Sequence, residues 1–349
     1  MQYKHIFGPV LSRRLGISLG VDLVVHKICS LDCIYCECGK TTDLTAAQNE
    51  IVRFADIKTE LDHFWMNNRD PDYITFSGSG EPTLNPCLGR VISYIKEKKP
   101  DIKVAVLTNA TLFDHPDVRS ALLNADRVVP SLDAAGEPAF FRINRPHRDI
   151  DLSEMIAGIQ TFAGEYTGEL YLEIFILPGI NDRPSDLEPL KQAVHKIGPD
   201  RVQINTLDRP GTRSRLRPAT QAELEKVVQF LEYPSIEIIA KVDKSIRSVL
   251  HGKELSAAIV ETVHRRPSTL QDLFQTLGSP HEEIEDCLDQ LERENKISSV
   301  SRERGIFFQT VKESDTAPAQ SLKSETKPTG NNRPGKELDK NPEDNNPDK

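Results

Sequence analysis

The sequence lacks long apolar runs and an excess of positive charge, and it has little cysteine outside one short segment. No run of about 18 apolar residues occurs, so the sequence predicts no membrane-spanning helix. The N-terminal residues contain no continuous apolar stretch before a small-residue cleavage site, so we expect no secretory signal and a cytoplasmic protein. The formal net charge of −9 argues against wholesale binding of nucleic acid, although local patches can still bind it.

Cysteine is concentrated near the N-terminus. The chain has six cysteines, and the clustered ones are Cys29, Cys33, Cys36 and Cys38. Thiols stay reduced in the cytoplasm, so this density predicts a metal or catalytic site rather than a disulfide framework. Cys87 and Cys287 are isolated in the sequence, and we expect them to be ordinary buried cysteines.

Short β-branched runs alternate with amphipathic stretches from about residue 21 to residue 240. The expected strands are residues 20–25, 73–78, 103–109, 127–133, 170–177 and 201–207, with an edge strand at 236–241. Helical patterns at 88–99, 152–166 and 186–198 lie between them. This alternation predicts βαβ units and a parallel sheet. Periodicity alone does not separate a partly closed barrel from an open doubly wound sheet.

The sequence after residue 250 follows another pattern. Residues 254–266, 268–278 and 279–295 predict three helices, and residues 296–309 predict a hairpin, which is the order of a winged helix. We therefore expect a core domain at 1–250, a winged-helix-like domain at 254–310 and a disordered tail at 311–349, whose composition is too polar to form a core. Residues 254–310 hold 11 acidic residues against 6 Lys or Arg, so we expect a protein-binding or structural module that does not bind DNA.

The uneven spacing of the clustered cysteines helps to distinguish three kinds of site: structural zinc, a thiol redox pair and an iron–sulfur cluster. Structural zinc sites pair two cysteine knuckles across a longer segment, and no second Cys or His pair follows Cys38 at a suitable spacing. A thiol redox pair of Cys33 and Cys36 is an alternative that leaves Cys29 without a role. An iron–sulfur cluster gives a role to all three of Cys29, Cys33 and Cys36. Cys-x3-Cys-x2-Cys supplies three thiolates to a [4Fe–4S] cube, so one iron has no protein ligand and is open to another ligand.

The segment CSLDCIYC, residues 29–36, resembles the signature of the radical S-adenosylmethionine (radical SAM) superfamily. The resemblance implies a partial (β/α)6 barrel of the TIM type, with Cys29, Cys33 and Cys36 as cluster ligands. It implies S-adenosylmethionine on the open iron, and reductive cleavage to methionine and a 5′-deoxyadenosyl radical. It also implies a flavodoxin- or ferredoxin-type electron donor, and contact between the backbone of Tyr35 and the adenine.

Further motifs end the next three expected strands. Gly78, Ser79, Gly80 and Glu81 resemble the superfamily's Gly-Gly-Glu motif, in which glycines allow close backbone approach and a carboxylate suits the cofactor's amino group. Asn109 ends the next strand, and Ser131 and Asp133 share one face at the end of the strand after it, resembling the family's ribose contacts. Parallel α/β folds build their sites at these strand ends. Ordinary turns and helix caps are the alternative.

The N-terminal residues 3–23 resemble a group of iron–sulfur oxidoreductases related to the enzymes that build the wyosine base of tRNA, over residues 3 to about 245. The resemblance leaves the substrate open. Arginine gathers at the predicted mouth of the barrel, and the candidate substrate residues are Arg142, Arg145 and Arg209. Guanidinium groups bind carboxylate and phosphate, so these residues suggest an anionic substrate such as a nucleotide, RNA or a phosphorylated metabolite. Surface ion pairs are the alternative.

Several functions follow from these patterns. The leading hypothesis is a radical SAM oxidoreductase that abstracts hydrogen from an unidentified substrate. The alternatives are a tRNA-modifying radical enzyme, a redox-sensing winged-helix regulator, and an activating enzyme that installs a radical on a partner protein. Cys38 lies two residues beyond the signature and is interpreted as a spare thiol beside the cluster, or as a rescue ligand or substrate-facing thiol.

Overall fold

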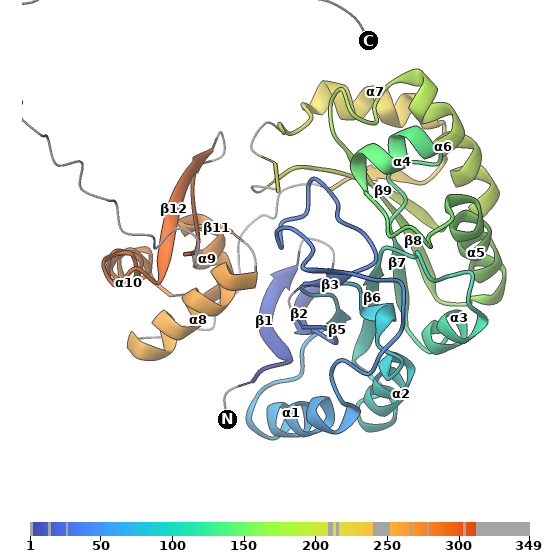
Figure 1. Ribbon diagram of the computed structural model, residues 1–349. Helices are drawn as coiled ribbons and strands as arrows, with labels where there is room; N and C mark the ends of the chain where they lie inside the picture. Colours follow the sequence, from blue (N-terminus) through green and yellow to red (C-terminus); the bar gives the residue numbers. More distant parts are fainter. Residues whose placement is uncertain are drawn as a thin grey trace, which may run out of the picture. The chain divides into compact units, whose positions relative to one another are not determined.

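The computed structural model describes residues 3–12, 15–25, 27–208, 212–213, 216–239, 252–265, 267–277, 279–302 and 305–311 (Figure 1). Arg209 and the expected disordered tail after residue 311 lie outside these ranges. The boundary expected near residue 250 also falls on residues that are not described.

The core of the fold is one mainly parallel sheet. Its strands, in spatial order, are β1 (Ile6–Ser12), β2 (Gly16–Val21), β5 (Tyr73–Phe76), β6 (Lys103–Thr108), β7 (Arg127–Pro130), β8 (Glu169–Ile176), β9 (Arg201–Thr206) and β10 (Ile236–Ile238). All neighbours pair in parallel except β1 and β2. The expected α/β fold is therefore confirmed, and the curved sheet is a partial barrel of the TIM type (Figure 1).

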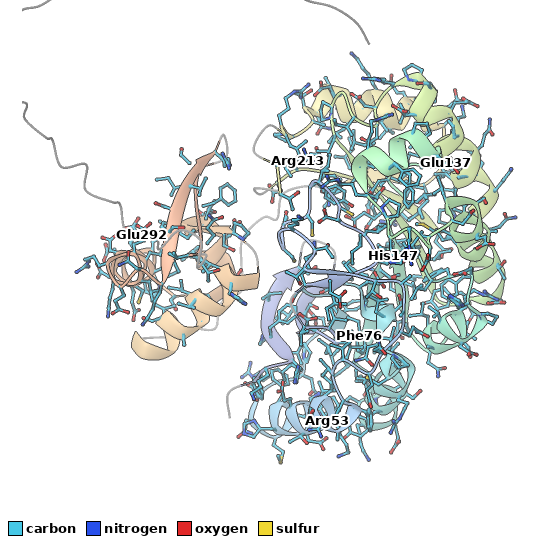
Figure 2. All side chains as sticks on the ribbon, in the orientation of Figure 1. Arg53, Phe76, Glu137, His147, Arg213 and Glu292 are labelled. Carbon is cyan, nitrogen blue, oxygen red and sulfur yellow. The ribbon has the colours of Figure 1, made fainter. Side chains whose placement is uncertain are left out.

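Helices cover the outer face of this sheet (Figure 1). They are α1 (Phe54–Asn67), α2 (Leu88–Lys98), α3 (Pro116–Leu122), α4 (Glu137–Ile143), α5 (Leu152–Glu165), α6 (Pro184–Ile197) and α7 (Gln221–Leu231). Strand residues on this face are fully buried, among them Ile174 and Phe76, which is labelled in Figure 2. The connections place every strand-to-helix loop at the same edge of the sheet, where the predicted site residues lie.

The first parallel strand begins earlier than predicted. Residues 20–25 are the expected strand, but β2 covers Gly16–Val21. Its ladder with β5 ends at the pair Val21 and Phe76, because the chain after β5 turns away into a glycine-containing loop. Leu23 and Val24 are still buried, 1% and 4% exposed, so their apolar pattern reflects packing rather than strand pairing. The antiparallel strand β1 is not among the expected elements.

Residues 252–311 contain a second set of elements with its own apolar cluster. They are α8 (Gly252–Arg265), β11 (Ser268–Thr269), α9 (Leu270–Leu277), α10 (His281–Arg293), β12 (Ile297–Arg302) and β13 (Gly305–Thr310). The three helices and the hairpin follow the expected order, and β11 adds a short third strand. The winged-helix name and the domain boundaries stay predictions. No helix in the described part of the chain has the length and hydropathy needed to cross a membrane.

A buried carboxylate ties the N-terminal segment to α1. Glu60 is 3% exposed and accepts hydrogen bonds from the backbone N–H groups of Lys4, His5 and Ile6 at 2.9, 2.9 and 3.0 Å. We expect Glu60→Ala to lower the free energy of unfolding by roughly 2 kcal/mol, because it leaves the buried N–H of Ile6 and two partly buried N–H groups without their acceptor. Urea unfolding measures this loss. The matched control is Glu97→Ala on the exposed face of α2, which we expect to change stability by less than about 0.5 kcal/mol.

Candidate cofactor site

The cysteine loop lies at the carboxyl edge of the barrel and is fixed by contacts with distant segments. It begins with the two-residue strand β3 (Ile28–Cys29), which pairs with β4 (Asp43–Leu44). The backbone N–H of Ile34 donates to the carbonyl of Ile143 at 3.0 Å, and that of His147 donates to the carbonyl of Ser30 at 2.9 Å. All six cysteines are free thiols. The loop therefore presents reduced sulfurs on a backbone that is held from outside it.

Each sulfur of the Cys-x3-Cys-x2-Cys motif accepts a hydrogen bond from a side-chain nitrogen. Asn109 Nδ2 donates to Cys29 Sγ and Asn144 Nδ2 donates to Cys33 Sγ, both at 3.5 Å. Lys27 Nζ donates to Cys36 Sγ at 2.8 Å. Hydrogen bonds of this kind stabilise thiolate ligands and tune iron–sulfur clusters.

The thiols differ in how readily they ionise. Burial raises the pKa of Cys29 to about 12, and burial also raises the pKa of Cys33 well above its usual range. A hydrogen bond from Cys38 and the ammonium of Lys27 lower the pKa of Cys36 to about 6, although burial opposes them. Near neutral pH, Cys29 and Cys33 would become thiolates only when a metal group binds to them. Binding of a metal group to this loop would therefore release protons.

The loop after β5 lies directly against the cysteine loop. A side-chain carbon added to Gly80 would lie 1.8 Å from the carbonyl oxygen of Ile28, so only glycine fits there. A side-chain carbon on Gly78 would lie 2.3 Å from Cγ of Asp22. Ser79 donates to Asp22 Oδ2 from its backbone N–H at 3.0 Å and from its hydroxyl at 2.6 Å. These contacts keep the backbone of the turn beside the sulfurs.

Glu81 is occupied by hydrogen bonds within the chain. Its carboxylate is 2% exposed and accepts from the Thr83 N–H and hydroxyl at 3.0 and 2.7 Å. It also accepts from the Thr108 hydroxyl at 2.6 Å and the Asn109 N–H at 2.7 Å. Burial raises the pKa of Glu81, and these hydrogen bonds oppose the rise. The carboxylate thus fastens its turn to the end of β6 and places Asn109 beside Cys29.

Asp133 occupies a similar position after β7, two strands along the sheet from β5. It accepts from the Tyr35 hydroxyl and Asn144 Nδ2, both at 2.6 Å, and from the backbone N–H of Phe175 at 2.9 Å. Burial raises the pKa of Asp133 to about 6. The Tyr35 ring stacks on Phe175 with centroids 3.9 Å apart and planes 8° apart. Ser131 is only partly buried, and its N–H donates to the carbonyl of Thr108 at 2.9 Å.

One buried polar atom in this site lacks a partner. Oδ1 of Asn144, whose side chain also touches Cys33 and Asp133, has no hydrogen-bond partner among the described residues. Buried acceptors are almost always satisfied, so an orphan beside the sulfurs fits a ligand that carries N–H or O–H groups. No three Cys, His, Asp or Glu side chains of the described chain converge as ligands of one ion. A cube of irons does not require such convergence, because each of the three thiolates would bind a different iron.

The arginines of the predicted mouth are used in ion pairs. Arg142 Nη2 contacts Asp186 Oδ1 at 2.9 Å, which joins α4 to α6. Arg145 Nη1 contacts Asp32 Oδ2 at 3.1 Å, which joins the segment after α4 to the cysteine loop. Arg209 lies outside the described residues. The two described candidates therefore have structural partners in this arrangement.

Three residues that touch the site are absent from the sequence-based prediction: Asp22, Lys27 and Asn144. Asp22 stands inside an expected strand, and Lys27 precedes the motif without matching any pattern. Of the three, only Asn144 could have been suspected from the sequence, because it lies in the segment FRIN, residues 141–144, shortly after Ser131 and Asp133. Their roles come from contacts between segments far apart in the sequence.

These residues fall within a recognised family. Residues 23–188, which carry the cysteine loop, the glycine turn and Asp133, match the family model of the radical SAM superfamily. The chain belongs to this superfamily, whose cofactors are a [4Fe–4S] cluster and S-adenosylmethionine. The expected superfamily and both of its cofactors are thereby confirmed.

Within the superfamily, the chain belongs with the UPF0026 proteins. A UPF0026 protein of Helicobacter pylori is 33% identical over 273 residues, which is 76% of this chain and 86% of that protein. A Brachyspira hyodysenteriae protein named GTPase Obg is 35% identical over 300 residues, 85% of this chain, and the chain spans only 44% of its length. A radical SAM methyltransferase from Sphaerobacter thermophilus superposes with a TM-score of 0.49 at 19% identity, covering 63% of this chain and 65% of that one.

Proposed function

We propose that the chain is a radical SAM oxidoreductase in which Cys29, Cys33 and Cys36 hold the [4Fe–4S] cluster. The observation that carries this assignment is the set of three thiols on one fixed loop, each with its own N–H donor. When bound, the cluster and S-adenosylmethionine together supply a 5′-deoxyadenosyl radical and methionine. Cys38, whose Sγ donates to the carbonyl of Gly78 at 3.5 Å, is assigned no iron.

We assign the cofactor contacts to groups of the site that are not already occupied by hydrogen bonds within the chain. The backbone of Gly78, Ser79 and Gly80 lines the cofactor, and Glu81 holds that backbone in place rather than binding the cofactor through its own occupied carboxylate. Ser131 offers a hydroxyl to the ribose. Asp133 fixes the Tyr35 ring, so that the Tyr35 backbone meets the adenine, and Asn144 Oδ1 accepts from a cofactor N–H or O–H group.

The test is anaerobic turnover. The protein is reconstituted with iron and sulfide, reduced with dithionite and mixed with S-adenosylmethionine, and 5′-deoxyadenosine is quantified by chromatography. We expect deoxyadenosine in excess of a control without dithionite. A fully loaded and reduced cluster that forms none, with or without added tRNA or nucleotides, would contradict the enzyme and favour the redox-sensing regulator.

We propose that the substrate is a polar molecule. An anionic small molecule is our first choice, and tRNA is the alternative. The described arginines support an anion only if it displaces Asp186 or Asp32 from them. The inner face of the sheet adds hydrogen-bonding groups: Asn205 Nδ2 donates to Glu173 at 3.0 Å, and Gln203 Nε2 donates to Glu237 at 2.7 Å. The electron donor is proposed to be a flavodoxin or ferredoxin in the cytoplasm.

GTP hydrolysis is not part of the proposal. The phosphate-binding loop of GTPases requires a glycine five residues before its Gly-Lys-Ser/Thr end. The chain contains Gly39-Lys40-Thr41, but Ile34 stands where that first glycine is needed. The segment also lies in the cysteine loop and not between a strand and a helix, so it lacks the required setting.

A further inference from the structure

The three donors to the cysteine sulfurs are not equivalent. Asn109 and Asn144 are neutral amides at 3.5 Å from Cys29 and Cys33. Lys27 carries a full charge and approaches Cys36 more closely, at 2.8 Å. A charged donor forms a stronger hydrogen bond than a neutral one, so Lys27 has the largest electrostatic effect of the three.

Lys27 is buried at a place where an ammonium needs a negative partner. The residue is 2% exposed, and its Nζ contacts Cys36 Sγ and the carbonyl of Gly39, both at 2.8 Å. No carboxylate pairs with it among the residues that the structure describes. Burying an unpaired charge is strongly unfavourable, so this pocket is built for negative charge on the sulfurs.

The backbone of Lys27 is fixed as well. Its N–H donates to the Thr42 hydroxyl at 2.8 Å, and its carbonyl accepts from the Thr42 N–H at 3.0 Å and from the Thr42 hydroxyl at 2.9 Å. The side chain therefore starts from a rigid point and spans the loop from Thr42 to Cys36. Lys40, in the same loop, is exposed and has no such setting.

We propose that Lys27 is a positioning residue that fixes the Cys36 sulfur and raises the reduction potential of the cluster. The inference rests on the proposed ligand set. A [4Fe–4S] cube with three thiolates gains one negative charge when dithionite supplies one electron. A cation in hydrogen-bond contact with a sulfur stabilises that reduced state more than the oxidised one, which makes reduction easier.

The test is a potentiometric titration of the reconstituted protein without S-adenosylmethionine. Electron paramagnetic resonance measures the fraction of reduced cluster at each potential. We expect Lys27→Met to lower the equilibrium constant for one-electron reduction about tenfold or more, which corresponds to a shift of about 59 mV to more negative potential. Lys27→Gln, which keeps an N–H donor without the charge, is expected to shift in the same direction. It also provides the measurement if the methionine variant does not fold.

The matched control is Lys40→Met, which removes an equal charge from the same loop and is expected to titrate like the native protein. The proposal is overturned if a loaded Lys27 variant has the native potential, or if Lys40→Met shifts as much as Lys27→Met. Iron and sulfide content per chain and circular dichroism show that each variant is loaded and folded. Failure of deoxyadenosine formation would contradict the proposed function but not this result, because the titration contains no S-adenosylmethionine.

Discussion

Replacing Cys33 with alanine is expected to reduce 5′-deoxyadenosine formation to background, while Cys38→Ala keeps most of it. Cys33 lies in the middle of the motif and accepts a hydrogen bond from Asn144, so its loss removes one of three thiolates and one of the two acceptors of Asn144 Nδ2. Cys38 instead faces the carbonyl of Gly78 at 3.5 Å. The measurement is deoxyadenosine per chain, together with iron and sulfide content, after anaerobic reconstitution.

The two variants separate the assigned ligands from the spare thiol. Each removes one sulfur from the same loop, so a general effect of thiol loss would reduce both activities equally. Equal loss in both variants, with equal loss of iron, would mean that Cys38 is a ligand and that the three-cysteine assignment is wrong. Retained turnover in Cys33→Ala would also contradict it.

Gly80→Ala is expected to destabilise the protein by about 3 kcal/mol and to abolish cofactor binding. The added carbon would lie 1.8 Å from a backbone oxygen at Ile28 and 2.8 Å from a methyl carbon of Val24, so the backbone itself must move. Overpacking of this kind destabilises proteins by roughly 1–3 kcal/mol, and contact with backbone places this site at the upper end. Thermal unfolding and binding of S-adenosylmethionine to the reconstituted protein measure the two effects.

Gly164→Ala is the matched control. Gly164 lies near the end of α5, is exposed, and has no atom within 4 Å of an added side-chain carbon. Alanine is the better helix former, so we expect a gain of roughly 0.5 kcal/mol and unchanged cofactor binding. Native stability in Gly80→Ala would show that the turn is not packed against β3 as described.

The sequence predicts the bounds of a strand well where the strand is buried and pairs with a neighbouring strand on each side. β6, β7 and β9 lie within the expected ranges, and β8 begins one residue before its range, because continuous apolar runs and pairing coincide there. The first parallel strand is misplaced because Leu23 and Val24 are apolar and buried, although the pairing of β2 with β5 ends at Val21 and Phe76. β1 has mixed character, and its pairing depends on β2 rather than on its own pattern.

The site is predictable to the extent that it lies in short motifs. The cysteines, the glycine turn and Asp133 come together because successive strand ends share one edge of the sheet. The cofactor contacts predicted for these residues stay predictions. The distinction between a carboxylate that binds a ligand and one that holds a loop depends on donors such as Thr108 and Phe175, which no local pattern indicates.

Lys27 shows the same limit most clearly. A lysine beside a loop is expected at the surface, and nothing within a few residues of it signals burial. Its partner sulfur is nine residues away, and its backbone partner Thr42 is fifteen residues away. The ion pairs of Arg142 and Arg145 likewise span 44 and 113 residues, so the sequence leaves open whether those arginines face a substrate or a carboxylate.

The contacts that hold the cysteine loop also set the order in which the protein can mature during synthesis. Asn109 follows Cys29 by 80 residues, and Asn144 follows Cys33 by 111 residues. At a translation rate of roughly 5–20 residues per second, Cys33 leaves the ribosome about 5–20 s before the amide that will contact it. The thiols therefore stay unshielded on the nascent chain, and the loop cannot acquire its native contacts before α4 and Asn144, the residue that follows it, have emerged. We therefore expect iron–sulfur insertion at the proposed site to follow the emergence of Asn144, and until then the thiols of the nascent chain are open to oxidation.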